Sequence, residues 1–226
     1  MKTKKVILFI VEGISDKNSL ALILSRLIRT ENIQFHIVGG DITSNKYNDS
    51  QNCISKINDE VNKFLKATRF RKSDILKIIH LVDMDGAYVD STAIKEGNTD
   101  KFIYNSDCII ASDIDKVKNR NERKSKILDK LSTTMAICKI NYYMYYFSCN
   151  LEHVLHNEQN VEDNLKDKYS DDFVERYDGK EDEFIEFLKK SVFSVQGDYK
   201  TTWQYIKIGL NSLNRYCNFH LFFENH

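Results

Sequence analysis

Hydrophobic and polar positions follow two different periods at the start of the chain. Residues 6–11 form an unbroken apolar run, typical of a strand that is covered on both faces. After residue 15 the leucines recur at helical steps, which predicts a helix that ends near Arg29. Gly13 stands between the two patterns and lets the backbone turn tightly. The chain is therefore expected to open with a strand that runs directly into a helix.

The same alternation of strand and helix patterns continues as far as residue 85. Residues 33–38 read as a second strand, which ends in a glycine pair at 39–40, a loop signal. Residues 50–68 carry apolar side chains at steps of three and four, which predicts an amphipathic helix. Residues 75–85 then read as a third strand. This order implies right-handed crossovers and a parallel sheet with helices on both faces.

The pattern is less regular in the middle of the chain. Residues 86–106 combine charges with little apolar periodicity, and we expect a long loop beside the strand ends. Residues 108–112 read as a fourth strand and residues 113–131 as a highly charged helix. Residues 140–148 are strongly strand-like, and a helix is expected to begin directly after them at Asn150.

The last part of the chain reads as helical. Helical patterns run through residues 161–177, 181–192 and 200–213. The closing stretch, 217–223, is too apolar to stand in water and is expected to pack on the body of the protein or on a partner. We therefore predict an α/β core with a mainly parallel sheet flanked by helices over residues 1–157, and a helical C-terminal region, 158–226, packed on this core.

Acidic residues stand at the ends of three predicted strands. Glu12 follows the first strand, and Asp83 and Asp85 end the third. Glu152 comes just after the strand at 140–148. Because the carboxyl ends of parallel strands meet at one edge of a sheet, these side chains are expected to lie together, where they repel one another unless a cation lies between them. Each acid taken alone also fits an ordinary polar loop start.

The order of these residues resembles the TOPRIM domain, the magnesium-dependent catalytic module of topoisomerases, primases, the OLD family and some small nucleases. The resemblance lies in a strand-Glu12-Gly13-x-x-Asp16-helix unit, followed one crossover later by a strand that ends in Asp83-x-Asp85. It covers about the first half of the chain. The chain is short for the tyrosine-bearing cleavage domain of a topoisomerase and has no primase-type cysteine cluster, so the resemblance points to the nucleases.

A second resemblance lies after the strand at 140–148. A later strand of OLD-type nucleases also ends in an acid-x-acid element, and RloB-like abortive-infection proteins carry an aromatic-Glu-x-x-Leu-x-His stretch. Asn150-x-Glu152 and His156 look like these elements. Asn150 departs from the OLD pattern, which has an acid at this position.

The resemblance implies roles for these residues. The implied metal ligands are Glu12, Asp16, Asp83, Asp85 and Glu152. Glu12, Asp83 and Asp85 are also the implied catalytic residues, and Glu12 alternatively serves as general base. The OLD resemblance further implies a catalytic lysine after the strand acids, for which Lys200 is our candidate, with Lys190 and Lys207 as competitors. We expect Asn150 to contact the substrate. For Asp16, an ordinary acid in the first turn of a helix is the alternative.

The balance of charges limits where a nucleic-acid-binding surface can lie on the protein. The chain has 33 basic and 33 acidic residues, so it has no global basic field for non-specific binding. A local patch is predicted on the helix at 113–131, with Lys116, Arg120 and Arg123 as phosphate contacts. Acids interleaved along this helix equally fit a solvated helix with ion pairs. The tyrosines at 140–148 fit either base stacking or, more simply, core packing.

Cysteine usage and hydropathy predict a cytoplasmic protein that contacts no membrane. The five cysteines lack C-x-x-C spacing and are odd in number, typical of reduced thiols. The sequence shows no signal peptide, and no apolar stretch approaches the roughly 18 residues of a membrane span. His153 and His156 lack the H-E-x-x-H spacing of a zinc pair.

These features together predict a metal-dependent phosphodiester nuclease that cuts DNA or RNA with Mg²⁺ or Mn²⁺. The resemblance implies phage defence and a separately encoded ATPase partner, and a homo-oligomer is left open. The alternative is a non-catalytic α/β domain that binds a cation or a nucleotide as a sensor or interaction module. Phosphate-binding G-x-x-x-x-G-K-[ST] and G-x-G-x-x-G turns are absent, which disfavours ordinary ATP or NAD binding. A response-regulator receiver would need an acid pair after the first strand, where Gly13 follows Glu12.

Overall fold

A central sheet of six strands carries the fold, in the order β2-β1-β3-β8-β7, with β9 also paired to β8. The computed structural model describes residues 5–28, 32–37 and 41–224 of the chain. The sheet consists of β1 (Val6–Val11), β2 (Asn32–Ile37), β3 (Ile75–Asp83), β7 (Ala136–Ile137), β8 (Ile140–Ser148) and β9 (Tyr216–Cys217). The four longer strands run parallel, whereas β7 and β9 run antiparallel to β8. The predicted α/β class with a mostly parallel, helix-flanked sheet is confirmed.

The unbroken apolar run of β1 explains its central place in the sheet. All six of its residues are buried, because it pairs with β2 on one side and β3 on the other and is covered on both faces. The predicted bounds of the strands agree with the structure to within two residues. The predicted helix end at Arg29, position 38 of the second strand and the glycine loop at 39–40 lie outside the described residues.

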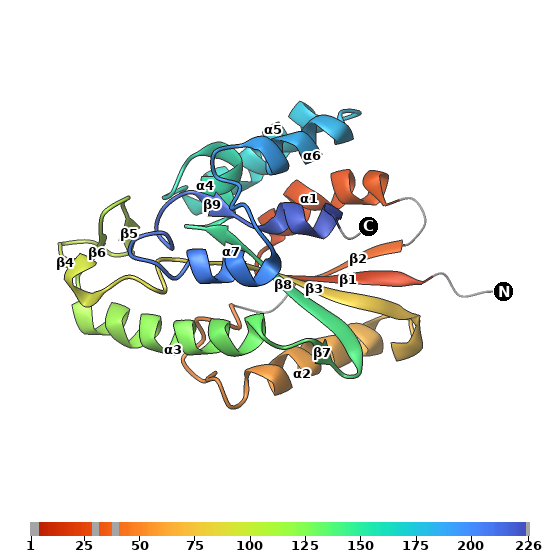
Figure 1. Ribbon diagram of the computed structural model, residues 1–226, viewed down its shortest axis with the longest axis horizontal. Coiled ribbons are helices and arrows are strands. Elements are labelled where there is room, and N and C mark those ends of the chain that lie inside the picture. The colour runs from red at the N-terminus through yellow and green to blue at the C-terminus, as the bar shows by residue number, and fades with distance from the viewer. Residues whose placement is uncertain (1–4, 29–31, 38–40, 225–226) are drawn as a thin grey trace.

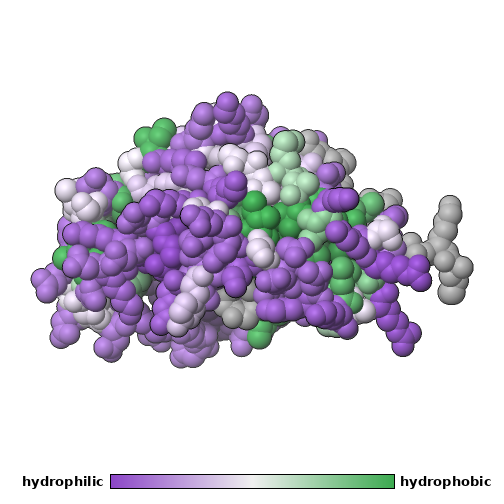
Figure 2. Space-filling view, turned by 90° about the horizontal axis from the view of Figure 1, so that it is seen from below, coloured by the Kyte–Doolittle hydropathy of each residue, from purple (hydrophilic) through white to green (hydrophobic). Residues whose placement is uncertain are grey.

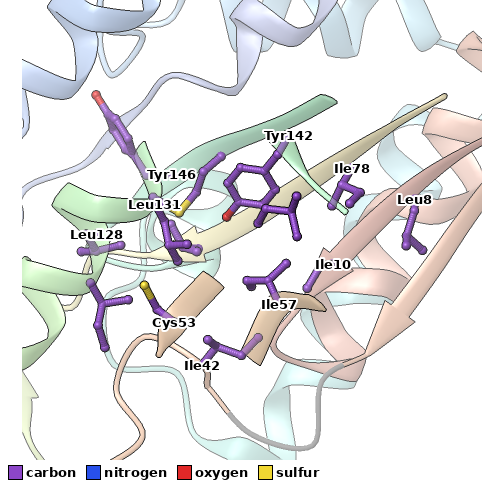
Figure 3. Close-up of a cluster of buried hydrophobic side chains, with 14 of the residues drawn as sticks. Leu8, Ile10, Ile42, Cys53, Ile57, Ile78, Leu128, Leu131, Tyr142 and Tyr146 are labelled. Carbon is purple, nitrogen blue, oxygen red and sulfur yellow. The ribbon is translucent and has the colours of Figure 1, made fainter. Parts of the chain in front are cut away.

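Helices cover both faces of the sheet (Figure 1). On one face lie α1 (Ile14–Leu27), α4 (Leu151–His156), α5 (Lys166–Tyr177) and α6 (Glu181–Lys190). On the other face lie α2 (Cys53–Ala67), α3 (Ile114–Ser132) and α7 (Tyr199–Tyr205). Figure 3 shows the alternate residues Leu8 and Ile10 of β1 in the core of this second face, with Ile10 next to Ile57 of α2. Successive side chains of each strand point to opposite faces of the sheet, so the strands contribute to two separate cores.

A second, small sheet lies where the sequence predicted a long loop. It has the order β4-β6-β5 and consists of β4 (Ile94–Glu96), β5 (Ile103–Tyr104) and β6 (Ile109–Ala111). The strand predicted at 108–112 therefore forms, but in this sheet. β4 and β5 were not predicted, because three and two residues carry little periodicity. Val117 and Leu213 belong to the core against which the small sheet packs.

The C-terminal region is less helical than predicted. The helix expected over 200–213 ends at Tyr205 and gives way to turns through Gly209, whose backbone has a φ of +54°. The chain then adds β9 to the main sheet beside β8. Residues 219–224 form a 3-10 helix whose phenylalanines are buried against β1 and β8, so this apolar stretch packs on the body of the protein, one of the two places expected for it.

The tyrosines of β8 serve mainly as core residues. Tyr142, Tyr145 and Tyr146 are buried, and only Tyr143 is substantially exposed. Tyr146 packs edge-on against Trp203, with ring centroids 5.1 Å apart. No helix in the described part of the chain is both long and apolar enough to cross a bilayer.

Candidate functional site

Acids from four parallel strands converge at one edge of the main sheet. Glu12 directly follows β1, and Asp83 is the last residue of β3, with Asp85 just beyond it. Glu152 lies in the first turn of α4, which begins after β8. Asp41 lies in the segment after β2 and was not among the sequence-predicted residues. All five occupy the carboxyl edge, where open α/β sheets place their ligands.

A buried lysine bridges two of these acids. The ammonium Nζ of Lys124 lies 2.6 Å from Oδ2 of Asp85 and 3.3 Å from Oδ2 of Asp41. The side chain is 0% exposed. Burial alone would lower the pKa of Lys124, but Asp41, Asp85 and Glu12 outweigh it and raise that pKa above its ordinary value. Lys124 therefore stays charged and acts as the internal counter-ion of the site.

The pKa values of Asp41 and Glu12 shift in opposite directions. Burial would raise the pKa of Asp41, but Lys124 and hydrogen bonds from Glu12, Ser44 and Thr43 hold that pKa below its usual range. Oδ1 of Asp41 accepts from the Thr43 hydroxyl at 2.6 Å and from the Ser44 amide at 2.9 Å. For Glu12, burial and then the Asp41 charge raise the pKa well above its ordinary value, although Lys124 acts to lower it. The buried Oε1 of Glu12 has no hydrogen-bond partner among the described residues.

A second group of acids lies beside the first and also has its own lysine. Oδ2 of Asp16 accepts from the Gly13 amide at 2.9 Å and closes the first turn of α1. Burial, offset in part by that hydrogen bond, raises the pKa of Asp16 to about 6. Burial and the charges of neighbouring acids, Asp16 first among them, raise the pKa of Asp83 well above its ordinary value. Nζ of Lys166 lies 3.4 Å from Oε1 of Glu152.

Glu12, Asp16 and Asp83 line a small cavity between the two groups. Its volume is about 10 Å³, close to the space that one water molecule occupies. Within the ranges that the structure describes, no three acid, histidine or cysteine side chains already stand as a finished metal site. The orphaned Glu12 oxygen and the repelling carboxyls around this cavity are nevertheless a hard-oxygen donor set of the kind that Mg²⁺ and Mn²⁺ take.

The turn after β3 is held by contacts from three other segments. Asp85 has a φ of 50°, uncommon for a residue with a side chain. Its amide donates to the Cys149 carbonyl at 2.8 Å, and its carbonyl accepts from Nη2 of Arg120 at 2.8 Å. The next amide, of Gly86, donates to the Ser212 carbonyl at 2.9 Å. These bonds fix the backbone from which the Asp85 carboxylate reaches Lys124.

Two predicted site residues, Lys200 and Asn150, differ in the structure from what the sequence predicted, Lys200 in its position and Asn150 in its contacts. Lys200 lies exposed in the first turn of α7, next to Asp198, which lines a pocket with Asn141 and Tyr143 near the start of β8. That is the opposite end of β8 from the acids, so Lys200 is not brought to the site. Asn150 caps α4: its oxygen accepts from the His153 amide and its nitrogen donates to the Gln159 carbonyl, both at 2.8 Å.

The competing lysines pair with acids that are not among those of the site. Lys190 pairs with Glu186 on α6, and Lys207 pairs with Asp129 at 2.5 Å. Of the two histidines, His153 accepts from the Cys149 amide at 3.0 Å through Nδ1, and His156 packs on aromatic rings of α5.

The three predicted phosphate contacts share the first half of α3 but differ in exposure. Lys116 is exposed, whereas Arg120 is buried and donates to the Tyr104 hydroxyl at 2.7 Å as well as to Asp85. Arg123 donates to the Ser44 carbonyl at 3.1 Å, and its buried Nε has no partner. Arg120 therefore positions the Asp85 turn, and each of its three guanidinium nitrogens donates one hydrogen bond within the protein.

Asp41, Lys124 and Lys166 are the residues that sequence reasoning missed, and two of them had signals. Asp41 follows a strand, as the recognised acids do. Lys124 lies three and four residues before Ile127 and Leu128, so it belongs to the buried stripe of α3 and not to its solvated face. For Lys166 only the fold shows that the start of α5 reaches Glu152.

Comparisons with known proteins found no match: no protein-family model, curated protein or solved structure matches the chain. The arrangement itself defines an α/β protein with a buried acid cluster at the carboxyl edge of a mostly parallel sheet.

Proposed function

We propose that this protein is a metal-dependent phosphodiester nuclease of the TOPRIM type, acting on DNA or RNA. One observation carries the proposal: Glu12, Asp16 and Asp83, from two different strand-helix units, enclose one small cavity in which burial and mutual repulsion raise their pKa values. Such a cluster costs stability in the absence of a cation, and a divalent cation removes the cost. A cluster of this kind is typical of a site that binds a cation for chemistry.

Mg²⁺ or Mn²⁺ would be held by Glu12, Asp16 and Asp83, with Asp85 and Glu152 beside them. When bound, the ion supplies an activated water and neutralises the leaving oxyanion of a phosphodiester. The carboxylates must draw together to bind the ion, because they do not yet form a finished ligand set. Lys124, and not Lys200, is the lysine that meets these acids: its fully buried ammonium lies against Asp85 and holds that carboxylate in place.

The test is cleavage of single-stranded, duplex and supercoiled substrates by the purified protein with Mg²⁺ or Mn²⁺ and with chelator. We expect cleavage that chelator abolishes and that Asp83→Asn removes without unfolding the protein. Cleavage that persists in chelator would contradict the proposal. So would the absence of cleavage across DNA and RNA substrates when a separately encoded ATPase partner is supplied.

A non-catalytic cation-binding domain is the second candidate, and one observation favours it. Lys124 already neutralises Asp41 and Asp85 within the protein, as a structural cation would. Metal binding without cleavage in the same assay would select this alternative. The phage-defence role and the ATPase partner rest on the family resemblance of Glu12, Asp83 and their neighbours alone.

A further inference from the structure

A groove on the outer side of α3 adjoins the acid site and has its own chemistry. It has a volume of about 660 Å³, and its lining includes Lys46, Phe102, Lys116, Arg120 and Arg123. This volume suits a ligand of nucleotide size. The left half of Figure 2, along which α3 runs, is largely hydrophilic, as expected for a surface that meets water or phosphate.

Hydrogen bonds tie the floor of the groove to the acid site. Arg120 donates to the carbonyl of Asp85, and Arg123 donates to the carbonyl of Ser44. The Ser44 amide in turn donates to Asp41. The two arginines thus contact the two backbone segments whose carboxylates Lys124 bridges. The groove is therefore joined to the acid site through these two backbone segments.

The charge of the groove favours an anion. Four basic side chains line it against two acids, Asp113 and Asp115. Asp113 is engaged as the cap of α3, where it accepts from the Lys116 amide at 2.9 Å, and Asp115 faces Lys118 at 3.9 Å. The arginines are held by carbonyls, whereas the ammonium groups of Lys46 and Lys116 stand at exposed positions. These two lysines are therefore the groups available to phosphates at the mouth of the groove.

Aromatic side chains in and beside the groove give it a second feature of a site for single-stranded nucleic acid, which is a set of rings on which bases can stack. The guanidinium of Arg120 lies 5.1 Å from the ring centroid of Phe102, and both line the groove. Beside the groove, Nζ of Lys46 lies 5.0 Å from the ring centroid of Tyr47, which is 74% exposed. A ring and a guanidinium plane stack with unpaired bases, which a duplex keeps inside its helix.

We propose that this groove binds single-stranded nucleic acid, with Lys46 and Lys116 on its phosphates and a base against Phe102, and leads the strand to the acid site. The inference rests on the proposed nuclease function for the fate of the strand, but binding itself needs no metal. It therefore names the substrate class of the enzyme as an unpaired strand.

Binding of the full chain to fluorescently labelled oligonucleotides, measured by anisotropy in chelator, tests the inference. Single-stranded DNA or RNA is expected to bind at least about tenfold more tightly than a duplex of equal length. Parallel measurements with DNA and with RNA show which of the two nucleic acids the groove prefers. Equal affinity for single strand and duplex would overturn the inference.

Substitutions of groove residues test whether binding takes place in the groove. Lys46→Ala combined with Lys116→Ala is expected to weaken single-strand binding about tenfold and to reduce the slope of log affinity against log salt by roughly 1.4, about 0.7 for each phosphate that no longer meets a lysine. Lys118→Ala is the matched control, because Lys118 lies on the same helix but lines a different depression. Phe102→Leu keeps an apolar side chain and is expected to weaken binding roughly tenfold, because the base has no ring to stack on. Affinity that is unchanged in all groove variants, or lowered equally by Lys118→Ala, would refute the site.

The two proposals fail in different ways. Groove-dependent binding without cleavage in Mg²⁺ would leave the single-strand site standing and remove the nuclease function. Metal-dependent cleavage that the groove variants do not affect would do the reverse.

Discussion

Glu12 and Asp83 differ at the residue scale from a carboxylate that only supports the fold. Each is half-buried next to other acids, and removal from water is the largest cause of its raised pKa. A structural acid such as Asp74 lies at the opposite end of β3 and accepts a hydrogen bond from the Arg71 amide at 2.8 Å. The first kind is strained without a cation, whereas the second supports the fold.

Glu12→Gln and Asp83→Asn should therefore separate activity from stability. Each is expected to lower metal-dependent cleavage by about 100-fold or more, since each ~1.4 kcal/mol of lost transition-state stabilisation is tenfold. Melting temperature in chelator should stay the same or rise, because repulsion is relieved. Asp74→Ala is the control and should cost about 0.5–2 kcal/mol with cleavage unchanged. Stability loss with retained cleavage in the first two variants would contradict the metal site.

Lys124→Met tests the internal counter-ion. Removing one partner of a buried ion pair leaves Asp41 and Asp85 uncompensated, at an expected cost of about 3–5 kcal/mol. Added Mg²⁺ should restore more of this stability than it gives to the wild type, if a divalent cation can replace the ammonium. Lys126→Met removes an exposed pair with Glu122 on the same helix and should change stability by at most about 1 kcal/mol. Urea denaturation of the three proteins, with and without Mg²⁺, gives the comparison.

At the scale of elements, the turn after β3 brings together parts that are distant in sequence. Gly86 has a φ of +67°, and a Cβ there would lie 2.7 Å from Leu213 and 2.9 Å from Ile109. The turn thus needs a glycine both for its backbone and for the close approach of the small sheet and the C-terminal turns. Through this turn, two regions outside the central sheet help to hold Asp85.

Gly86→Ala should accordingly destabilise the protein by about 2–4 kcal/mol, from the left-handed backbone and from crowding together. Gly179→Ala is the matched control, since Gly179 has a φ of +71° but open space around it. It should cost only the backbone penalty of about 1–2 kcal/mol. Thermal melting measures both, and equal losses would show that the packing at Gly86 is loose.

At the scale of the whole molecule, raised carboxyl pKa values make stability depend on pH. In the metal-free protein, burial raises the pKa of Asp16 to about 6, against ~3.9 in an unfolded chain. For this group the folded state then holds more protons than the unfolded state, so the contribution of Asp16 to stability is greatest below pH ~4 and falls as the pH rises towards about 6. Asp16→Asn should flatten this fall, which denaturant titrations across the interval measure. A stability that rises over the same interval in the wild type, unchanged by Asp16→Asn, would argue against the raised pKa.

Cation binding should be coupled to proton release from the same carboxyls. Glu12 and Asp83 must lose their protons to become ligands, so affinity for Mg²⁺ should rise with pH and binding should release protons. Calorimetry in two buffers of different ionisation enthalpy counts these protons, and Asp83→Asn should release fewer. Binding that is independent of pH would place the cation elsewhere.

The sequence by itself determined the main sheet, its helices and the strand-end acids. Long strands such as β1 and β8 have strong periodicity, and parallel order sends Glu12, Asp83 and Glu152 to one edge whatever the details of packing. Only the tertiary structure decided which cations meet these acids. The sequence could place Lys124 on the buried stripe of α3, but only the fold shows that its ammonium lies 2.6 Å from Asp85.

The small sheet and β9 were also decided by tertiary contacts, because strands of two or three residues form only where a neighbour offers unpaired backbone groups. The same holds for the end of α7 at Tyr205, where the apolar pattern continues but the chain turns back to reach Gly86. Periodicity reports which side of an element is buried. It does not report what that side is buried against, and this depends on contacts between residues far apart in the chain.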